Sequence, residues 1–277
     1  MKNNFTMSLI WKESIFLRYD LSKLISTGNL MFFKDGDTVI SQHFFNFNFS
    51  EEDINNINRM LDDGFKIKFS YVDKTLYKKI LKIFGKKNVY ILDKWDAPIL
   101  KSDNIDDYLR NTLHSQVKKN YANYLKSRKK YKFVMNNKKN GIKLWCDVLK
   151  VDYNSWKGKN KCDMKSLNRE DLQYIFHLLY NEKESSLLVC YSDDEPLAYS
   201  LMFKNNQNNM WYAVKWGASF DGRKKYLGIY SLFEHLLYLQ KCNGKIDVDF
   251  WGRRSQVYDS LKNYDVERYH IMIKKDD

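Results

Sequence analysis

The chain has 277 residues, of which 44% are hydrophobic and 16% aromatic, and this composition excludes an intrinsically disordered protein. Its formal net charge of +13 favours an anionic partner such as a nucleic acid. Only nine of the 47 basic residues are arginine, the residue that bidentate contacts to nucleic acids favour, so a lysine-rich compositional bias is the alternative source of the charge.

The sequence also indicates where the protein is located and which kinds of site it lacks. No stretch approaches about 18 apolar residues without a charge, so we expect no membrane span, and the N-terminus lacks the apolar core of a signal peptide. The four cysteines and five histidines match no metal-ligand spacing. We therefore expect a reduced, cytoplasmic protein without a metal site.

Residues 1–100 predict a small α/β half of their own. A hairpin is expected around Gly36, between strands at Leu30–Phe33 and Thr38–Phe49. Ser50 begins a helix with a capping box, whose apolar residues share one face. The remaining elements alternate between strand and helix: Phe65–Tyr71, Leu76–Phe84 and Asn88–Leu92.

A long basic helix is predicted from Asn104, which caps it, to Lys132. Its other positions are rich in lysine and arginine, with interleaved tyrosines. This surface is either an RNA-binding face, where lysines meet phosphates and rings stack on bases, or a solvated charged face. The inward stripe repeats every four residues: Leu109, Leu113, Val117, Tyr121 and Leu125.

Two more helices and three strands follow this basic helix. The helices cover Leu144–Trp156 and Leu167–Asn181. The strands cover Ser185–Tyr191, Leu197–Phe203 and Met210–Trp216.

The loop from Gly217 to Gly228 contains three glycines and three consecutive cations, Arg223, Lys224 and Lys225. Directly after it, apolar residues recur at helical spacing from Ile229. Glycines let the backbone approach a ligand closely, and the first turn of a helix offers unbonded N–H groups and a positive dipole end. The loop is therefore either an anion or phosphate site or a solvated basic turn before a helix.

The strand Lys245–Trp251 places Asp247, Asp249 and Trp251 on one face. Carboxylates near the C-terminal end of a strand lie where α/β proteins tend to have their sites. A short helix that contains Tyr258 follows. The two carboxylates either take part in such a site or pair with nearby cations: Arg253, Arg254 or lysines.

Five short stretches, in their order and spacing, carry a resemblance to a known superfamily: Trp156-Lys157, Glu195–Ala198, Tyr226–Leu232, Asp247–Gly252 and Tyr258. They resemble the GNAT superfamily of N-acyltransferases and, more narrowly over residues 95–270, its CelD/BcsL-like branch, which is related to the FemABX-like transferases. The chain departs from that branch at Tyr226-Leu227-Gly228, where a Pro-Gly or Gly-x-Gly pattern is usual, and at Asp259, where a lysine often follows the tyrosine.

The resemblance implies an α/β (α+β) protein with a GNAT-like fold, in which helices flank a mixed central sheet. Residues 1–100 are expected to form a degenerate N-terminal GNAT-like half, and residues 101–277 the acyltransferase domain. Acetyl-CoA or another acyl-CoA is the implied co-substrate, bound beside Met210–Trp216 with its pyrophosphate on Lys224–Gly228. The predicted cofactor-binding residues are Val214, Trp216, Arg223, Lys224, Lys225, Tyr226, Leu227 and Gly228.

Two residues are predicted for the chemistry of N-acylation, which needs an amine freed of its proton and a proton donor for the leaving thiolate. Asp249 is the predicted base or amine anchor, and Tyr258 is, by the resemblance, the predicted acid. Trp156 matches a family position at the acceptor pocket, or else it is an ordinary core or lid aromatic. The predicted substrate-binding residues are Trp156, Tyr212, Asp247 and Trp251.

Three functions are compatible with these patterns. The first is an acyl-CoA-dependent N-acyltransferase, of the acetyltransferase type, that acts on the amine of a small molecule such as an amino sugar or an amino-acid derivative. The second is a FemABX-like transferase that takes its aminoacyl group from a tRNA held by the basic helix 104–132. The third is a non-enzymatic nucleic-acid-binding protein that uses this helix alone.

Overall fold

The computed structural model describes residues 15–16, 19–44, 47–137, 139–159, 169–180, 184–205, 210–251 and 256–275. The chain forms two compact units: unit 1 is Met1–Ala97 with Asp265–Asp277, and unit 2 is Pro98–Tyr264. The sequence predicted a division at residue 100 with the whole C-terminal part in the second domain. The end of the chain instead belongs to unit 1, because strand β11 (Tyr264–Ile273) pairs antiparallel with β4 (Lys66–Asp73).

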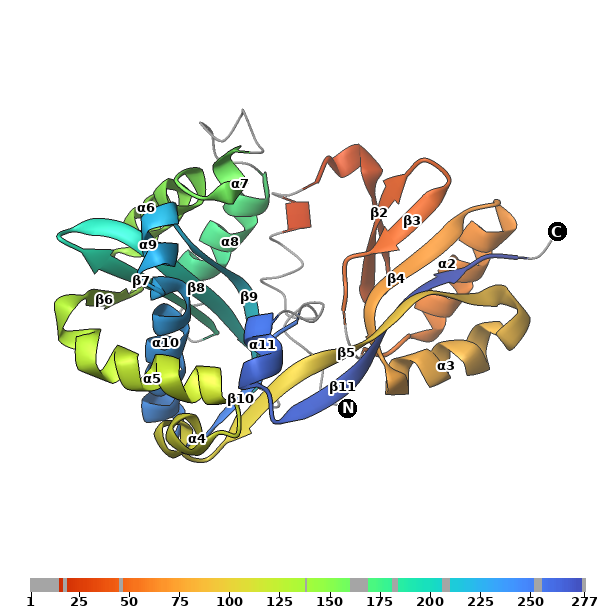
Figure 1. The fold of residues 1–277 in the computed structure, drawn as a ribbon. Helices are drawn as coiled ribbons and strands as arrows, with labels where there is room; N and C mark the ends of the chain where they lie inside the picture. The colour runs from red at the N-terminus through yellow and green to blue at the C-terminus, as the bar shows by residue number, and fades with distance from the viewer. Residues whose placement is uncertain are drawn as a thin grey trace. The chain divides into compact units, whose positions relative to one another are not determined.

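Unit 1 is a mixed sheet covered by two helices (Figure 1). Strands β1 (Leu24–Thr27), β2 (Leu30–Asp35) and β3 (Thr38–Ser41) are antiparallel neighbours, and β3 lies parallel to β4. The β2–β3 hairpin turns at Gly36 as predicted, but β3 ends at Ser41 rather than at Phe49. That this unit is a degenerate copy of the GNAT-like fold stays a prediction.

The helices of unit 1 form where the sequence predicts them. The predicted capping box of Ser50 and Asp53 begins α2 (Glu51–Asp62). The Asp73 side chain caps α3 (Lys74–Phe84), and the apolar faces of both helices pack on β4 and β11 in one buried core. The predicted strand after α3 is β5 (Val89–Ser102), which is longer than expected and contains the boundary between the units.

Unit 2 contains a six-stranded sheet in the order β5, β10, β9, β8, β7, β6. Only β10 and β9 are parallel; the other neighbours are antiparallel. The predicted strands are all present, as β7 (Ser185–Ser192), β8 (Glu195–Asn205), β9 (Met210–Ala218) and β10 (Ile246–Asp249). The sequence did not predict the edge strand β6 (Lys132–Met135).

Helices cover both faces of this sheet (Figure 1). On one face α5 packs against α10, where the rings of Tyr121 and Phe233 lie 5.3 Å apart. On the other face α6 packs on β8, where the Tyr199 hydroxyl donates to the buried Asp152 carboxylate over 2.7 Å. The helices of unit 2 are α4 (Ile105–Asn111), α5 (Ser115–Ser127), α6 (Gly141–Tyr153), α7 (Trp156–Lys159), α8 (Arg169–Tyr180), α9 (Phe220–Lys224), α10 (Leu227–Asn243) and α11 (Gln256–Leu261).

The predicted single helix over residues 104–132 is wrong, because it is divided into α4 and α5. Asn104 caps α4 as expected, but Thr112 is extended and Leu113, placed in the inward stripe, is fully exposed. The two helices pack against each other, and the Tyr121 hydroxyl of α5 donates to Asp106 of α4. This contact requires the chain to turn between them, so the break is a product of tertiary packing.

None of the helices in the described part of the chain is long and apolar enough to cross a membrane. Within the same residues, no group of three or more His, Cys, Asp or Glu side chains is arranged to hold a metal ion.

Candidate functional site

A groove opens in unit 2 where β9 extends beyond β10. The parallel pairing joins Asp247–Asp249 to Met210–Tyr212, and β10 then ends while β9 continues to Ala218. The space beside the continuing part of β9 has a volume of about 1180 Å³. Its described lining residues are His114, Gln116, Val117, Asn120, Ser155, Trp156, Trp216, Gly217, Ala218, Arg223, Tyr226, Gly228, Ile229, Gln256, Val257, Asp259 and Ser260.

The first wall of the groove comes from a segment that the sequence predicted as a loop but that folds into α9. Ser219 caps this helix, because its hydroxyl accepts the Gly222 N–H over 3.0 Å. Gly222 lies against β8, and a Cβ at this position would come within 2.2 Å of the Leu197 carbonyl oxygen. The glycine is therefore needed for close packing of α9 on β8 rather than for a flexible phosphate loop.

The start of α10 forms the part of the groove that suits an anion. Tyr226 has a left-handed backbone with φ of 59°, and no side chain caps the helix that begins at Leu227. The first N–H groups of a helix have no partner within it and carry a partial positive charge. Gly228 and Ile229 line the groove, and a Cβ on Gly228 would come within 3.2 Å of the Trp216 ring. Amide groups of this 17-residue helix therefore approach the groove closely.

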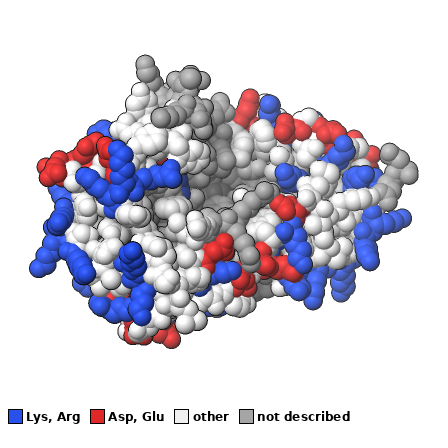
Figure 2. Space-filling model, in the orientation of Figure 1, with Lys and Arg blue, Asp and Glu red and all other residues white. Residues whose placement is uncertain are grey.

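The three consecutive cations occupy different positions at this wall. Arg223 lines the groove, whereas Lys224 pairs with Asp221 over 2.9 Å and its hydrogen bond lowers the pKa of that carboxyl. Lys225 is exposed in the turn before α10. Figure 2 shows lysine and arginine side chains gathered over α9 and along α5. The groove therefore has one cation in its described lining and further positive charge around it.

Tyr258 belongs to α11, another helix that lines the groove, but it lies behind the lining residues of that helix. Its ring stacks on Phe250 with centroids 4.6 Å apart and lies 5.7 Å from the Trp216 ring. Burial raises the pKa of the Tyr258 hydroxyl, and a hydrogen bond with Trp216 opposes this effect. The hydroxyl is thus a protonated group beside a residue of the groove, although Tyr258 is not among the lining residues.

The acidic strand β10 is mostly buried and does not line the groove. Asp249 is 1% exposed, and its carboxylate accepts the Trp251 backbone N–H over 2.8 Å. Asp247 is half-buried in the sheet, opposite Met210, and Tyr212 is buried beside Asp249. None of these residues belongs to the described lining of the groove. Arg253 and Arg254, the expected alternative partners of the carboxylates, lie outside the described residues.

Two further predicted cofactor-binding residues, Val214 on β9 and Leu227 at the start of α10, do not belong to the described lining of the groove. Val214 is half-buried at a register shift between β8 and β9, where Leu201 faces Lys215 but Met202 faces Ala213. Leu227 is completely buried at the start of α10. Of the predicted residues, the groove brings these together: Trp156, Trp216, Arg223, Tyr226 and Gly228.

Sequence reasoning missed the wall contributed by α5 and the one contributed by α11. His114, Gln116 and Asn120 line the groove only because the chain turns between α4 and α5. The available indication was weak, since Thr112 and Ser115 are residue types that favour a helix start and no glycine or proline marks the break.

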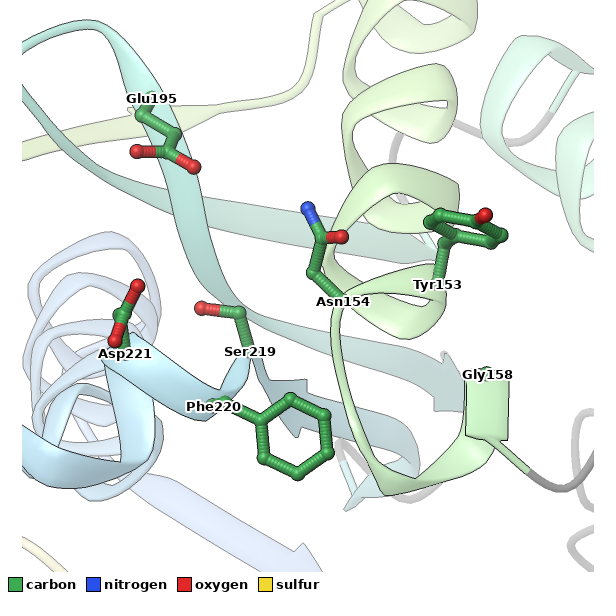
Figure 3. A pocket seen from close by; sticks show the side chains of 7 residues that line it. All are labelled: Tyr153, Asn154, Gly158, Glu195, Ser219, Phe220 and Asp221. Carbon is green, nitrogen blue, oxygen red and sulfur yellow. The ribbon is translucent and has the colours of Figure 1, made fainter.

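A second, smaller pocket lies beside α9 and has a volume of about 550 Å³. Figure 3 shows Glu195 of β8 and Asp221 of α9 on one side of it and residues from the end of α6 on the other. The backbone N–H of Phe220 donates to the Asn154 carbonyl over 2.8 Å and so ties α9 to α6. The lining residues are Tyr153, Asn154, Gly158, Glu195, Ser219, Phe220 and Asp221.

Comparison with known proteins identifies the fold. No protein-family model and no curated protein matches the sequence. Among solved structures, L-PGS from Bacillus licheniformis is similar with a TM-score of 0.64 and 12% identity, over 92% of this chain and 84% of that one. FemX gives 0.57 and 10% over 96% and 92%, and a tandem GNAT protein from the clavulanic acid biosynthesis pathway gives 0.51 and 9% over 90% and 79%.

At such low identity these likenesses show the fold alone. The predicted fold class is confirmed: the chain is an α/β protein with a GNAT-like fold, whose mixed sheet is flanked by helices. The narrower CelD/BcsL-like branch stays a prediction.

Proposed function

We propose that this protein is an N-acyltransferase that takes an acyl group from an acyl-CoA, of which acetyl-CoA is the simplest, and transfers it to the amine of a small molecule. The observation that carries the proposal is the groove at the free end of β9, into which the start of α10 and the Arg223 side chain both face. A diphosphate suits this wall, because helix N-termini and arginine both bind phosphate oxygens.

The donor would extend from that wall along β9. Its pyrophosphate would contact the Leu227 and Gly228 amides and Arg223, with Lys224 and Lys225 adding charge at the rim. An extended, amide-containing arm suits the backbone from Val214 to Ala218, which lies beyond the end of β10. The reacting thioester would then lie near Trp216, in the part of the groove next to α11.

In the reaction the amine nitrogen attacks the thioester carbonyl carbon, the carbon–sulfur bond breaks, and the thiolate takes up a proton. We assign proton donation to Tyr258, because its hydroxyl adjoins Trp216 and burial keeps it protonated at neutral pH. The amine loses its proton to a base, and Asp249 stays our prediction for that role. Asp249 is buried at the end of β10 and does not belong to the described lining, so it would act from beneath the surface of the groove, with Asp247, Tyr212 and Trp251 nearby. Trp156, which is 56% exposed at the groove, would cover the acceptor.

A second proposal, FemABX-like transfer from aminoacyl-tRNA, is favoured by the basic surface of α5. Exposed lysines of α5 and the turn after it lie on the same element as the groove residues Gln116 and Asn120. An RNA held there would be close to the groove. The exposed cations are Lys118, Lys119, Lys126, Arg128, Lys129 and Lys130.

Thermal unfolding in the presence of CoA tests the first proposal. CoA at 100 times its Kd should add about 2.7 kcal/mol to the free energy of unfolding. Arg223→Gln should weaken CoA binding about tenfold, because a hydrogen bond to a charged group is lost, whereas Lys126→Gln, an exposed cation elsewhere on unit 2, should leave it unchanged. If Arg223→Gln binds CoA with the affinity of the wild type, the proposed diphosphate site is wrong.

Binding of tRNA, followed at several salt concentrations, separates the alternatives. Steeply salt-dependent binding without any response to CoA favours aminoacyl-tRNA as the donor. If tRNA binds but no aminoacyl group is transferred, a non-enzymatic nucleic-acid-binding protein is supported.

A further inference from the structure

Tyr226 combines a strained backbone with an exposed aromatic ring in the groove. Its φ of 59° lies in the left-handed region, which glycine adopts freely and which residues with a bulky side chain rarely adopt. The residue is 58% exposed and belongs to the groove lining. Within the described part of the chain, no other ring stacks on it and no group forms a hydrogen bond with its hydroxyl.

The core of unit 2 does not depend on the Tyr226 ring. Helix α10 packs on the sheet through buried residues, among them Leu227, Leu232 and Phe233, whereas an exposed ring adds little to this core. A glycine would adopt the same backbone conformation at lower cost, because it has no Cβ that approaches the following carbonyl oxygen. The ring therefore has a role other than packing, and its position in the groove indicates contact with a ligand.

The neighbours of Tyr226 indicate which part of a ligand the ring meets. Arg223 also lines the groove, and its carbonyl accepts the Tyr226 N–H over 3.0 Å, so both residues belong to one tight turn. Lys225, exposed in the same turn, adds a second cation. The Leu227 and Gly228 amides, which the proposed diphosphate would contact, follow directly in the sequence. An aromatic ring between phosphate-binding groups suits a nucleotide, in which a flat base is joined to phosphates.

A nucleobase fits this position better than the acyl chain of the donor does. An apolar chain is stabilised by removal from water, and an exposed ring beside exposed cations offers it no enclosed apolar wall. A base instead needs one flat face to stack on and keeps its polar edge in water. The guanidinium group of Arg223 supplies a second planar surface in the same lining, and such groups both stack on aromatic faces and pair with phosphates.

We propose that Tyr226 is a stacking platform for the nucleobase of the acyl donor. The donor class is then a nucleotide-linked one, such as a CoA thioester, whose adenine would lie on the Tyr226 ring. A thioester of the same pantetheine arm on a carrier protein has no base and would be a poor donor. This inference rests on the proposed function for the identity of the reaction, but stacking of a base on Tyr226 is measured by binding alone.

Calorimetric binding of two probes tests the stacking platform. CoA carries the base, whereas 4′-phosphopantetheine has the same amide-containing arm and a phosphate but no nucleoside. Tyr226→Gly keeps the left-handed turn and removes the ring. This variant should bind CoA about tenfold more weakly than the wild type, because one base–ring stack is lost, and should bind 4′-phosphopantetheine with unchanged affinity. Tyr226→Phe keeps the ring and should bind CoA as the wild type does.

Two controls separate loss of the ring from a general effect on the fold. The thermal midpoint of Tyr226→Gly should stay close to that of the wild type, since relief of the left-handed strain offsets the greater freedom of glycine in the unfolded chain. Tyr238→Ala removes another exposed tyrosine of α10, outside the described lining of the groove, and should leave CoA affinity unchanged. The platform is overturned if Tyr226→Gly binds CoA as tightly as the wild type, or if its affinity for 4′-phosphopantetheine falls as much as its affinity for CoA.

Failure of the proposed function has a different signature. If the wild type does not bind CoA, the acyl-CoA donor is wrong, and the same variants are then compared for binding of a short RNA that ends in an unpaired adenosine. About tenfold weaker binding of this RNA by Tyr226→Gly assigns the platform to a nucleotide-linked donor of the RNA type. Equal binding of the RNA by Tyr226→Gly and the wild type overturns the platform.

Discussion

The ion pair between the buried Asp152 and Lys215 is expected to contribute to the stability of unit 2, and this contribution can be measured. Asp152 is 1% exposed at the end of α6, and its carboxylate accepts the Tyr199 hydroxyl and lies 3.0 Å from the Lys215 nitrogen. The same ammonium group lies 5.3 Å from the centre of the Trp145 ring. This pair ties the end of α6 to β9.

Lys215→Met should be strongly destabilising. Removing one partner of a buried ion pair typically costs about 3–5 kcal/mol, because the other charge is left uncompensated. The Lys215 side chain is 21% exposed, so water can partly solvate the remaining charge, and we expect a loss near the lower end, about 3 kcal/mol. Urea denaturation followed by tryptophan fluorescence gives this difference as a change of midpoint at constant m-value.

The double variant Asp152→Asn with Lys215→Met provides the matched control. It removes both charges together, while the asparagine carbonyl still accepts the Tyr199 hydroxyl, so most of the lost stability should return. If the single Lys215→Met variant is as stable as the wild type, the ion pair is not the attachment of α6 to β9 that the geometry indicates. If the double variant is no more stable than the single one, the loss comes from side-chain packing rather than from removal of the Lys215 charge beside the Asp152 carboxylate.

Three other predictions follow from the structure. Gly222→Ala should destabilise unit 2 by about 1–3 kcal/mol in the same denaturation assay, because its Cβ would clash with the Leu197 carbonyl, and unchanged stability would mean that α9 is free to move. Burial lowers the pKa of His235 to about 3, so the unfolded chain binds a proton that the folded chain excludes. Stability should therefore be fully present above about pH 6.5 and fall progressively as the pH decreases from there toward 3, and thermal unfolding across that range checks it; a flat profile contradicts a neutral buried histidine. Tyr258→Phe should lower kcat for acyl transfer about 100-fold with little change in CoA affinity, since general acid catalysis is lost while the ring packing stays, and an unchanged kcat would assign the proton to another donor.

Local physics accounts for the elements that the sequence predicted correctly. The run Ser185–Tyr191 is apolar on both faces because helices cover both sides of that part of the sheet. The Ser50 capping box and the apolar stripe from Ile229 depend only on neighbouring residues, and both form α-helices as expected. Such features can be predicted from a short stretch of sequence without information on the rest of the chain.

The features that the sequence did not predict depend on distant contacts. The break at Thr112–His114 exists because α4 and α5 pack together. No pattern in the neighbouring residues predicts this packing. The segment Phe220–Lys224 was expected to be a loop because of its glycines and cations, but the Ser219 cap and the close approach of Gly222 to β8 favour a helix. In both cases tertiary packing overrides the local preference.

The two carboxylates Asp249 and Asp259 show why residue type and position along a strand do not suffice to locate a site. Asp249 stands at the end of a strand, where α/β proteins often have their chemistry, yet Val248 and Phe250 on either side of it are also buried and the carboxylate is only 1% exposed. Asp259 belongs to a six-residue helix without a recognisable motif, and it reaches the groove because α11 packs through Tyr258 and Leu261 and leaves its other face open. The exposure of a carboxylate, rather than its distance from the end of a strand, decides whether it lines the groove, and this exposure is determined by packing between α11 and β9 that only the folded chain brings together.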